Sequence, residues 1–176
     1  AAQKGADFIV TPEMTNAVDK NAERLIDALP EGEDIDEVRA FSQAASENGV
    51  WLLIGSMAIK RRDGRLANRS FLYGPDGEIA ARYDKIHMFD VSLENGESWR
   101  ESRVYHPGNE AVVVATPLAA FGLSICYDVR FPHLYRALAH REDDALALAQ
   151  RHHLGARLHA RALLGQHELA TGEVGP

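Results

Sequence analysis

The sequence has very little cysteine, with one thiol in 176 residues. One cysteine cannot form a disulfide within the chain, so we expect the reducing environment of the cytoplasm. Basic residues are outnumbered as well, with 19 Lys and Arg against 26 Asp and Glu and a net charge of −7. Nucleic acids and anionic membranes attract proteins with clustered positive charge, whereas this chain is acidic overall. No apolar run approaches the ~18 residues of a membrane-spanning helix. We therefore expect neither nucleic acid nor membrane as a partner.

The C-terminal part lacks the residues that usually build a sheet. All 13 aromatic residues and all eight isoleucines precede Arg136, whereas five of the eight histidines lie at or after His140. The residues beyond are rich in Ala and Leu, which favour helices, and we identify no strand among them that could enter a buried sheet. We therefore predict a partial domain over residues 1–140 and a tail over residues 141–176, which we interpret as frameshifted or disordered.

Strand and helix patterns alternate within residues 1–140. Apolar runs predict strands at 7–11, 50–59, 70–74, 78–84, 111–116 and 121–128. Helical spacing predicts helices at 17–29, 34–48 and 131–140. Asp34 is the expected N-cap of the second helix and Gly49 its stop. The first residues resemble the end of a helix, so we interpret the chain as a fragment, and the order of elements predicts an α/β layered fold.

The only thiol, Cys126, directly follows the apolar run Leu123 to Ile125. A turn from a strand into a helix exposes a nucleophile, and a helix N-terminus lowers the pKa of a thiol and offers N–H groups to an oxyanion. The alternative is a small apolar residue packed in the core. A nucleophilic thiol needs a base, for which His87, His133 or a buried carboxylate are the candidates.

Two charged residues also follow strand-like runs. Glu13 comes after the strand 7–11 and Pro12, and Lys85 comes after the run 78–84. Each has a simpler interpretation as an exposed surface residue, because lone charges at strand ends are usually solvated. A carboxylate, an ammonium and a thiol at the ends of three strands would instead converge on one rim of a sheet. There the carboxylate could act as a base and the ammonium could stabilise an oxyanion.

These three segments together resemble the nitrilase, or carbon–nitrogen hydrolase, superfamily. "FIVTPEMTN" resembles its glutamate motif, "RYDKIHMFDV" its lysine motif and "GLSICYDVRFPHLYRALA" its cysteine motif, in the family's order and spacing. "ESRVYHPG" resembles the segment that carries a second active-site glutamate, here Glu101. The resemblance covers residues 1–139 and is strongest to the Nit branch, which includes omega-amidases and deaminated-glutathione amidases.

The resemblance implies an αββα four-layer sandwich, here incomplete at both ends, and a Glu–Lys–Cys triad. Cys126 would attack the carbon of a non-peptide amide, and Glu13 would take the thiol proton and hand it to departing ammonia. Lys85 and the backbone N–H of Tyr127 would hold the oxyanion. Glu101 would position the substrate and the hydrolytic water. No metal and no cofactor are expected.

Arg130 has two interpretations. Its planar guanidinium could hold a substrate carboxylate, which would favour a small carboxylate-bearing ω-amide as the substrate. It could equally form an ion pair with Asp128 or with a neighbouring subunit, since the family implies a homodimer or larger assembly.

Four functional hypotheses remain open. The leading one is a thiol amidase that releases ammonia from a small ω-amide. A nitrilase or a carbamoyl hydrolase would share the triad and differ in the pocket. A Cys–His hydrolase would use a histidine as the base. A truncated, non-catalytic binding module would keep the residues without their geometry.

The composition of the tail generates a prediction about the chain. A sheet without its flanking strands exposes unpaired backbone groups, and the stability of a domain is normally only ~5–15 kcal/mol. We expect residues 1–176 alone to be aggregation-prone and to release no ammonia from a small ω-amide. Gel filtration, a thermal transition and an ammonia assay check this, and a cooperative, monodisperse and active protein would contradict it.

Overall fold

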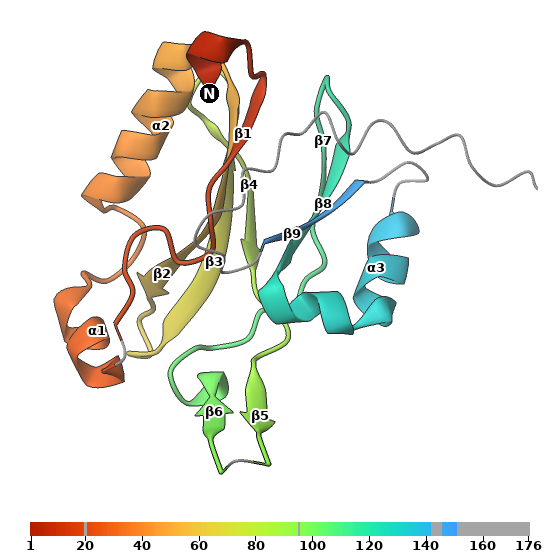
Figure 1. The fold of residues 1–176 in the computed structure, drawn as a ribbon. Coiled ribbons are helices and arrows are strands. Elements are labelled where there is room, and N and C mark those ends of the chain that lie inside the picture. The colour runs from red at the N-terminus through yellow and green to blue at the C-terminus, as the bar shows by residue number, and fades with distance from the viewer. Residues whose placement is uncertain (20, 95, 142–145, 151–176) are drawn as a thin grey trace, which may run out of the picture.

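The computed structural model describes residues 1–19, 21–94, 96–141 and 146–150 (Figure 1). The helices are α1 (Ala22–Ala28), α2 (Asp36–Asn48) and α3 (Pro132–Ala139), with short 3-10 helices η1 (Ala2–Lys4), η2 (Glu101–Arg103) and η3 (Cys126–Arg130). The strands are β1 (Phe8–Val10), β2 (Trp51–Lys60), β3 (Leu66–Tyr73), β4 (Ile79–Asp84), β5 (Asp90–Ser92), β6 (Ser98–Arg100), β7 (Val113–Ala115), β8 (Ala120–Ile125) and β9 (Leu146–Gln150).

Four layers follow one another across the molecule. The first sheet has the order β1-β2-β3-β4, with β1 parallel to β2 and the other pairs antiparallel. The second sheet has the order β7-β8-β9, with β7 antiparallel and β9 parallel to β8. Figure 1 shows α2 on the outer face of the first sheet and α3 beside the second. The expected αββα arrangement is confirmed.

The outer face of the first sheet is covered by α2 through one buried cluster. Val38 and Ala45 of α2 share this cluster with Ile54 and Met57 of β2. Side chains alternate along a strand, so residues 54 and 57 would normally face opposite ways. The register between β2 and β3 shifts between these two residues, and this bulge returns Met57 to the helix-covered face.

The two sheets pack against each other through a second cluster. Leu53, Leu72 and Tyr83 from the first sheet share it with Leu123 and Ile125 of β8. On the other face of β8, a side chain at Gly122 would lie 3.1 Å from Leu138 Cδ1 of α3. Glycine therefore lets α3 approach the strand that ends at the thiol.

One expectation about the tail is wrong. Residues 146–150 form β9, and every residue of β9 pairs in parallel with β8. We had expected no strand beyond residue 140. The segment "LALAQ" contains no aromatic or β-branched residue. Its strand conformation depends on hydrogen bonding to the neighbouring strand, which local propensity does not reveal. The rest of the tail, residues 151–176, lies outside the described residues.

Other expectations about the elements hold in part. The helix expected at 17–29 is confined to α1, and Asn21 accepts a hydrogen bond from the backbone N–H of Arg24 at its start. Asp34 is not the N-cap of α2, because that position belongs to Ile35 and Asp34 instead pairs with Arg39. The β5–β6 hairpin was not predicted. In the described part of the chain, no helix combines the length and apolar character needed to cross a bilayer.

The loop after β1 lies directly over the bulge of β2. The N–H of Ser56 donates to Pro12 O at 3.3 Å, and the hydroxyl of Ser56 accepts from the N–H of Met14 at 3.0 Å. A Cβ on Gly55 would lie 2.3 Å from Thr11 O and 2.5 Å from Pro12 O, far inside van der Waals contact. Only glycine at position 55 therefore lets residue 13 sit where it does.

This close approach predicts the effect of one methyl group. Gly55→Ala should displace the loop and lower the free energy of unfolding by about 1–3 kcal/mol, as overpacking does. Hydrogen exchange at the N–H of Ser56 should accelerate, because its acceptor is Pro12 O. Gly64→Ala is the control, since Gly64 has a left-handed φ of 81° but open space around its Cβ. The Gly64→Ala variant should lose about 1–2 kcal/mol of stability from backbone strain alone, and hydrogen exchange at the N–H of Ser56 should stay unchanged.

Candidate active site

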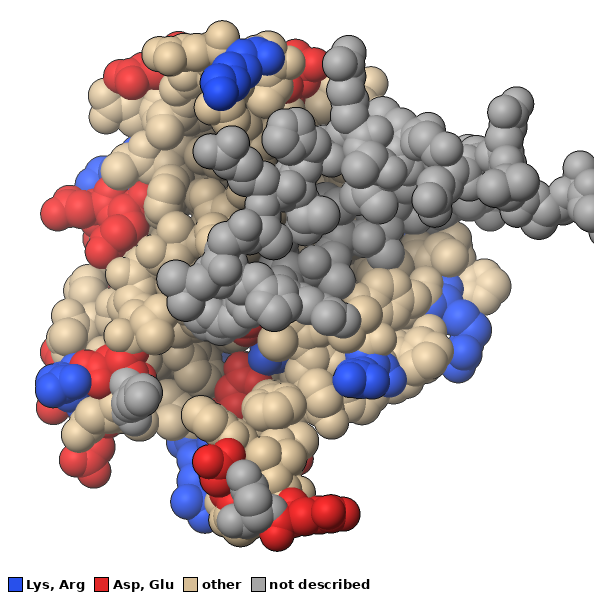
Figure 2. All heavy atoms as spheres, viewed as in Figure 1, with Lys and Arg blue, Asp and Glu red and all other residues tan. Residues whose placement is uncertain are grey.

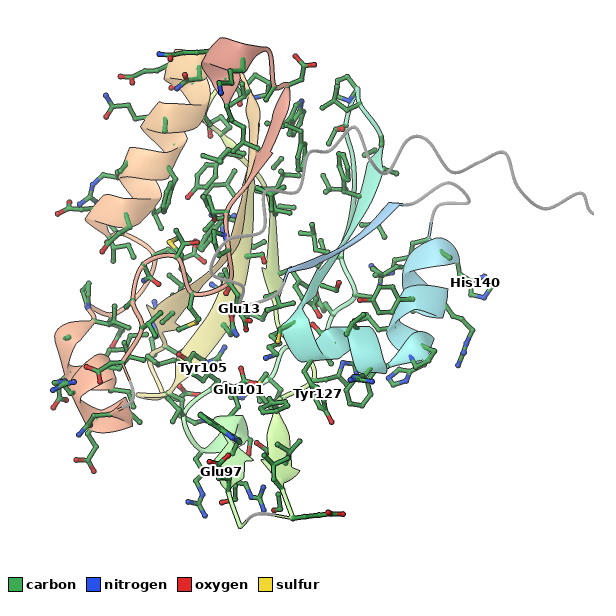
Figure 3. All side chains as sticks on the ribbon, viewed as in Figure 1. Glu13, Glu97, Glu101, Tyr105, Tyr127 and His140 are labelled. Carbon is green, nitrogen blue, oxygen red and sulfur yellow. The ribbon has the colours of Figure 1, made fainter. Side chains whose placement is uncertain are left out.

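The structure brings together the residues that we expected at the ends of strands. Glu13 follows β1, Lys85 follows β4 and Cys126 follows β8, while Glu101 begins η2 after the β5–β6 hairpin. Figure 3 shows Glu13 and Glu101 at the same end of the two sheets, above the hairpin. The carboxyl ends of strands from both sheets therefore supply one cluster.

Lys85 is the centre of this cluster. Its side chain is only 2% exposed, so the interpretation as an exposed edge lysine is wrong. Its Nζ lies 2.7 Å and 3.0 Å from the two carboxylate oxygens of Glu101 and 3.5 Å from Glu13 Oε1. Burial opposes the charged form, but the negative charges of Glu101 and Glu13 outweigh it and raise the pKa of Lys85. The side chain is thus a buried ammonium.

Glu101 is fully occupied as an acceptor. Its Oε1 accepts from Lys85 and from Asn68 Nδ2, the latter at 3.3 Å. Its Oε2 accepts from Lys85 and, at 2.6 Å, from the backbone N–H of Phe89. Two carboxylate oxygens offer about four lone-pair sites, so no site of Glu101 is left for a further donor.

Glu13 differs because one of its oxygens is not engaged. Its side chain is 5% exposed, which excludes the interpretation as a solvated surface residue. Oε1 accepts from Asn68 Nδ2 at 2.9 Å and faces Lys85. Oε2 is buried and has no hydrogen-bond partner among the described residues. This oxygen retains its lone pairs for a proton.

Cys126 occupies a strained position. Its φ is 47°, in the left-handed region that residues other than glycine rarely adopt, and such strain is common at functional turns. Burial, and next the negative charge of Glu13, raise the pKa of the thiol to about 11, while Lys85 opposes them. This net shift is opposite in direction to the lowering that we expected from a helix N-terminus. The thiol is protonated at neutral pH.

Asp128 holds the turn at Cys126 in place and was missed as a site residue. It is fully buried, and its Oδ2 accepts from the Tyr83 hydroxyl at 2.6 Å and the Ile125 N–H at 3.0 Å. Its Oδ1 accepts from the backbone N–H of His87 at 2.9 Å. The carboxylate therefore ties the end of β8 to the segment that follows Lys85.

The two histidines considered as bases have other contacts. His87 Nδ1 lies 2.7 Å from Asp128 Oδ1, and its ring stacks on Phe131 with centroids 3.7 Å apart. His133 is exposed and meets His87 through the two Nε2 atoms, 3.1 Å apart. The groups that shift the pKa of the Cys126 thiol are carboxylates and Lys85, not these imidazoles. The geometry favours Glu13 over either histidine as the base.

The remaining expected residues lie at the edge of the cluster. The ring of Tyr127 packs edge-on against Phe89 with centroids 5.1 Å apart, and its backbone N–H belongs to the first turn of η3. Arg130 is exposed and has no ion-pair partner within the described ranges, so a pair with Asp128 is not formed. No group of three or more potential metal ligands occurs among the residues that the structure places.

Two further site residues, Asn68 and Tyr105, were not predicted. Burial and the charges of Glu101 and Glu13 raise the pKa of the Tyr105 hydroxyl. Asn68 stands in β3 on the same strand face as Ser70 and Leu72, toward the second sheet. A polar residue on a face that packs another sheet was the available signal, and it required knowing the strand register.

Known proteins resemble this chain in sequence. A carbon–nitrogen hydrolase family model matches residues 1–167, beyond the boundary at 140. A deaminated glutathione amidase of Yersinia enterocolitica is 42% identical over 99 residues, covering 54% of this chain and 35% of the relative. A Xenopus tropicalis omega-amidase is 35% identical over 136 residues, covering 76% and 48%. The chain thus spans half or less of the length of these relatives.

Solved structures agree with the sequence matches. The C. elegans NitFhit protein superposes with a TM-score of 0.67 at 26% identity, over 85% of this chain and 44% of that one. A carbon–nitrogen hydrolase from Helicobacter pylori gives 0.67 at 26% identity, over 82% and 48%. The expected resemblance to the Nit branch is confirmed by these relatives. The chain belongs to the carbon–nitrogen hydrolase family.

Proposed function

We propose that this site hydrolyses the amide of a small ω-amide through a thioester on Cys126. The observation that carries the proposal is the buried ammonium of Lys85, held between Glu13 and Glu101 next to a thiol in a strained turn. A buried charge cluster of this kind costs stability unless it is fully paired, so its presence at three strand ends favours a functional role.

Acylation begins at the thiol. Because the thiol is protonated at neutral pH, Glu13 Oε2 accepts its proton as sulfur attacks the amide carbon. The carbonyl electron pair moves to oxygen, and Lys85 and the backbone N–H of Tyr127 stabilise this oxyanion. The first N–H groups of a helix have no partner within it, which suits the second role. The C–N bond then breaks, and nitrogen leaves as ammonia with the proton from Glu13.

Deacylation repeats the proton transfer with water. Glu13 removes a proton from a water molecule that attacks the thioester, and returns it to the sulfur as the acid product leaves. Glu101 contributes mainly by holding Lys85, since all its lone-pair sites are occupied. To position substrate or water, Glu101 would have to break one of these bonds.

The substrate class rests on fewer contacts. Arg130 is exposed and unpaired within the described ranges, which leaves it available to a substrate carboxylate. The relatives named omega-amidase and deaminated glutathione amidase support the same class. A nitrilase or carbamoyl hydrolase with the same triad is the alternative within enzymes, and an inactive binding module is the alternative outside them. The cytoplasmic location and a homodimeric or larger assembly also remain proposals.

The nucleophile is tested by deleting the thiol. The parent in these tests is a version of this protein extended to the length of its relatives. In it, Cys126→Ala should reduce ammonia release from a small ω-amide by about a thousandfold or more, because a group that acts as part of a triad leaves little activity when removed. Acid-quenched parent protein should show the mass of a thioester adduct that the variant lacks. Ser124→Ala is the control at the same strand end, where the hydroxyl faces Tyr135 of α3. Equal ammonia release from Cys126→Ala and the parent would rule out the nucleophile.

The role of Glu13 as the base is tested by measuring the pKa of the Cys126 thiol and the rate of amide hydrolysis separately. Glu13→Gln removes the charge that raises the pKa of the thiol while burial and Lys85 remain, so this pKa should fall below about 11. Amide hydrolysis should nevertheless fall about 100-fold or more, because the proton acceptor is lost. The pH dependence of thiol modification by a small neutral disulfide reagent measures the first effect, and ammonia release measures the second.

Glu23→Gln on exposed α1 is the matched control and should change neither quantity. Parent-like hydrolysis by Glu13→Gln would exclude this residue as the base. An unchanged thiol pKa would show that the two side chains are not coupled.

A further inference from the structure

The amide of Asn68 joins the two glutamates of the site. Asn68 is 2% exposed and lies in β3, in the middle of the first sheet. Its Nδ2 donates to Glu13 Oε1 at 2.9 Å and to Glu101 Oε1 at 3.3 Å. One –NH2 group therefore uses its two hydrogens on two different carboxylates.

The orientation of this amide is determined by its neighbours. Turned by half a rotation, the side chain would place its oxygen against two carboxylate oxygens, with no hydrogen between them. In the orientation that the structure has, Asn68 Oδ1 is buried without a hydrogen-bond partner among the described residues. An unsatisfied buried acceptor lowers stability, so the amide keeps this orientation at a cost, and its contribution lies in the two bonds that it donates.

The donors around Glu13 determine which of its oxygens can act. Asn68 Nδ2 and Lys85 both face Oε1, and neither faces Oε2. With one oxygen fixed from two directions, the carboxylate cannot rotate without losing both partners. The free oxygen then keeps one position relative to the thiol of Cys126.

We propose that Asn68 is the positioning residue of this site, which fixes Glu13 with Oε2 free to exchange a proton with Cys126. This role rests on the proposed function, in which Glu13 is the base. The ionisable groups around Glu13 are Lys85 after β4, Glu101 in η2, Tyr105 after η2 and Cys126 in η3. Asn68 does not titrate, so it acts on Glu13 by geometry.

The first test replaces the amide with a side chain of similar size and no donor. In Asn68→Leu, kcat for ammonia release should fall about 10- to 100-fold, because small displacements of a reacting group carry losses of this order. KM should change by less than about twofold, since Asn68 does not reach the substrate in this scheme. The pH midpoint of thiol modification should move toward that of Glu13→Gln. Asn68→Ala, which removes the donor without adding a charge, should act in the same direction if the leucine variant folds poorly.

Tyr73→Phe is the matched control on the same strand. It removes a buried hydroxyl that donates to Val38 O at 3.2 Å, outside the site. It should lower the unfolding temperature and leave kcat and the thiol profile at parent values. If Asn68 contributed to stability alone, Asn68→Leu would show this same pattern, with a lower unfolding temperature and with kcat and the thiol profile at parent values.

The decisive measurement combines two substitutions. If Asn68 acts through Glu13, then Asn68→Leu should change kcat and the thiol profile in the parent and should add nothing in a Glu13→Gln background. Equal effects in both backgrounds, or no effect in either, would overturn the positioning role. If the extended parent released no ammonia but the thiol profile still behaved as described, the proposed function would fail and the role of Asn68 would stand.

Discussion

Holding one ammonium between two carboxylates inside the protein is the constraint on which the rest of the site depends. Each of these charges would be costly to bury alone, and removing one partner would leave the others uncompensated. Lys85, Glu13 and Glu101 come from segments far apart in the sequence, so the strands that deliver them must end at the same level. The first sheet satisfies this requirement for Glu13 and Lys85, which follow β1 and β4, and the β5–β6 hairpin leads to Glu101 (Figure 3).

The charges of the described residues differ in arrangement between the surface and the interior. On the face drawn in Figure 2, the described basic side chains lie at separate places and form no continuous patch. The concentrated electrostatics lie in the interior, where burial and neighbouring charges alter the acidity of Lys85, Tyr105 and Cys126. A protonated thiol beside a carboxylate reacts by transferring its proton during attack, which differs from the preformed thiolate of a cysteine paired with a histidine.

The sequence was informative wherever a residue's position in a strand determined its place. Glu13, Lys85 and Cys126 each follow an apolar run, and strand ends meet by geometry, so their convergence could be predicted. The role of Asn68 could not be predicted, because it depends on which face of β3 packs against the second sheet. The strand β9 was missed because Ala and Leu favour helices locally, while pairing with β8 determines the outcome. The prediction of Asp34 as the N-cap of α2 was wrong, because Arg39 pairs with the same carboxylate.

The contacts of Asp128 have a consequence for how the site can adapt to a ligand. The carboxylate is bonded both to the strand that ends at Cys126 and to the segment that follows Lys85. Neither segment can shift without unpairing a fully buried charge, so the nucleophile and the cation form one rigid body. Glu101 instead arrives on η2, next to the short β5–β6 hairpin whose Trp99 is 56% exposed. Adjustment to ligands of different length is therefore left to the exposed β5–β6 hairpin, because Glu101 itself is held by Lys85.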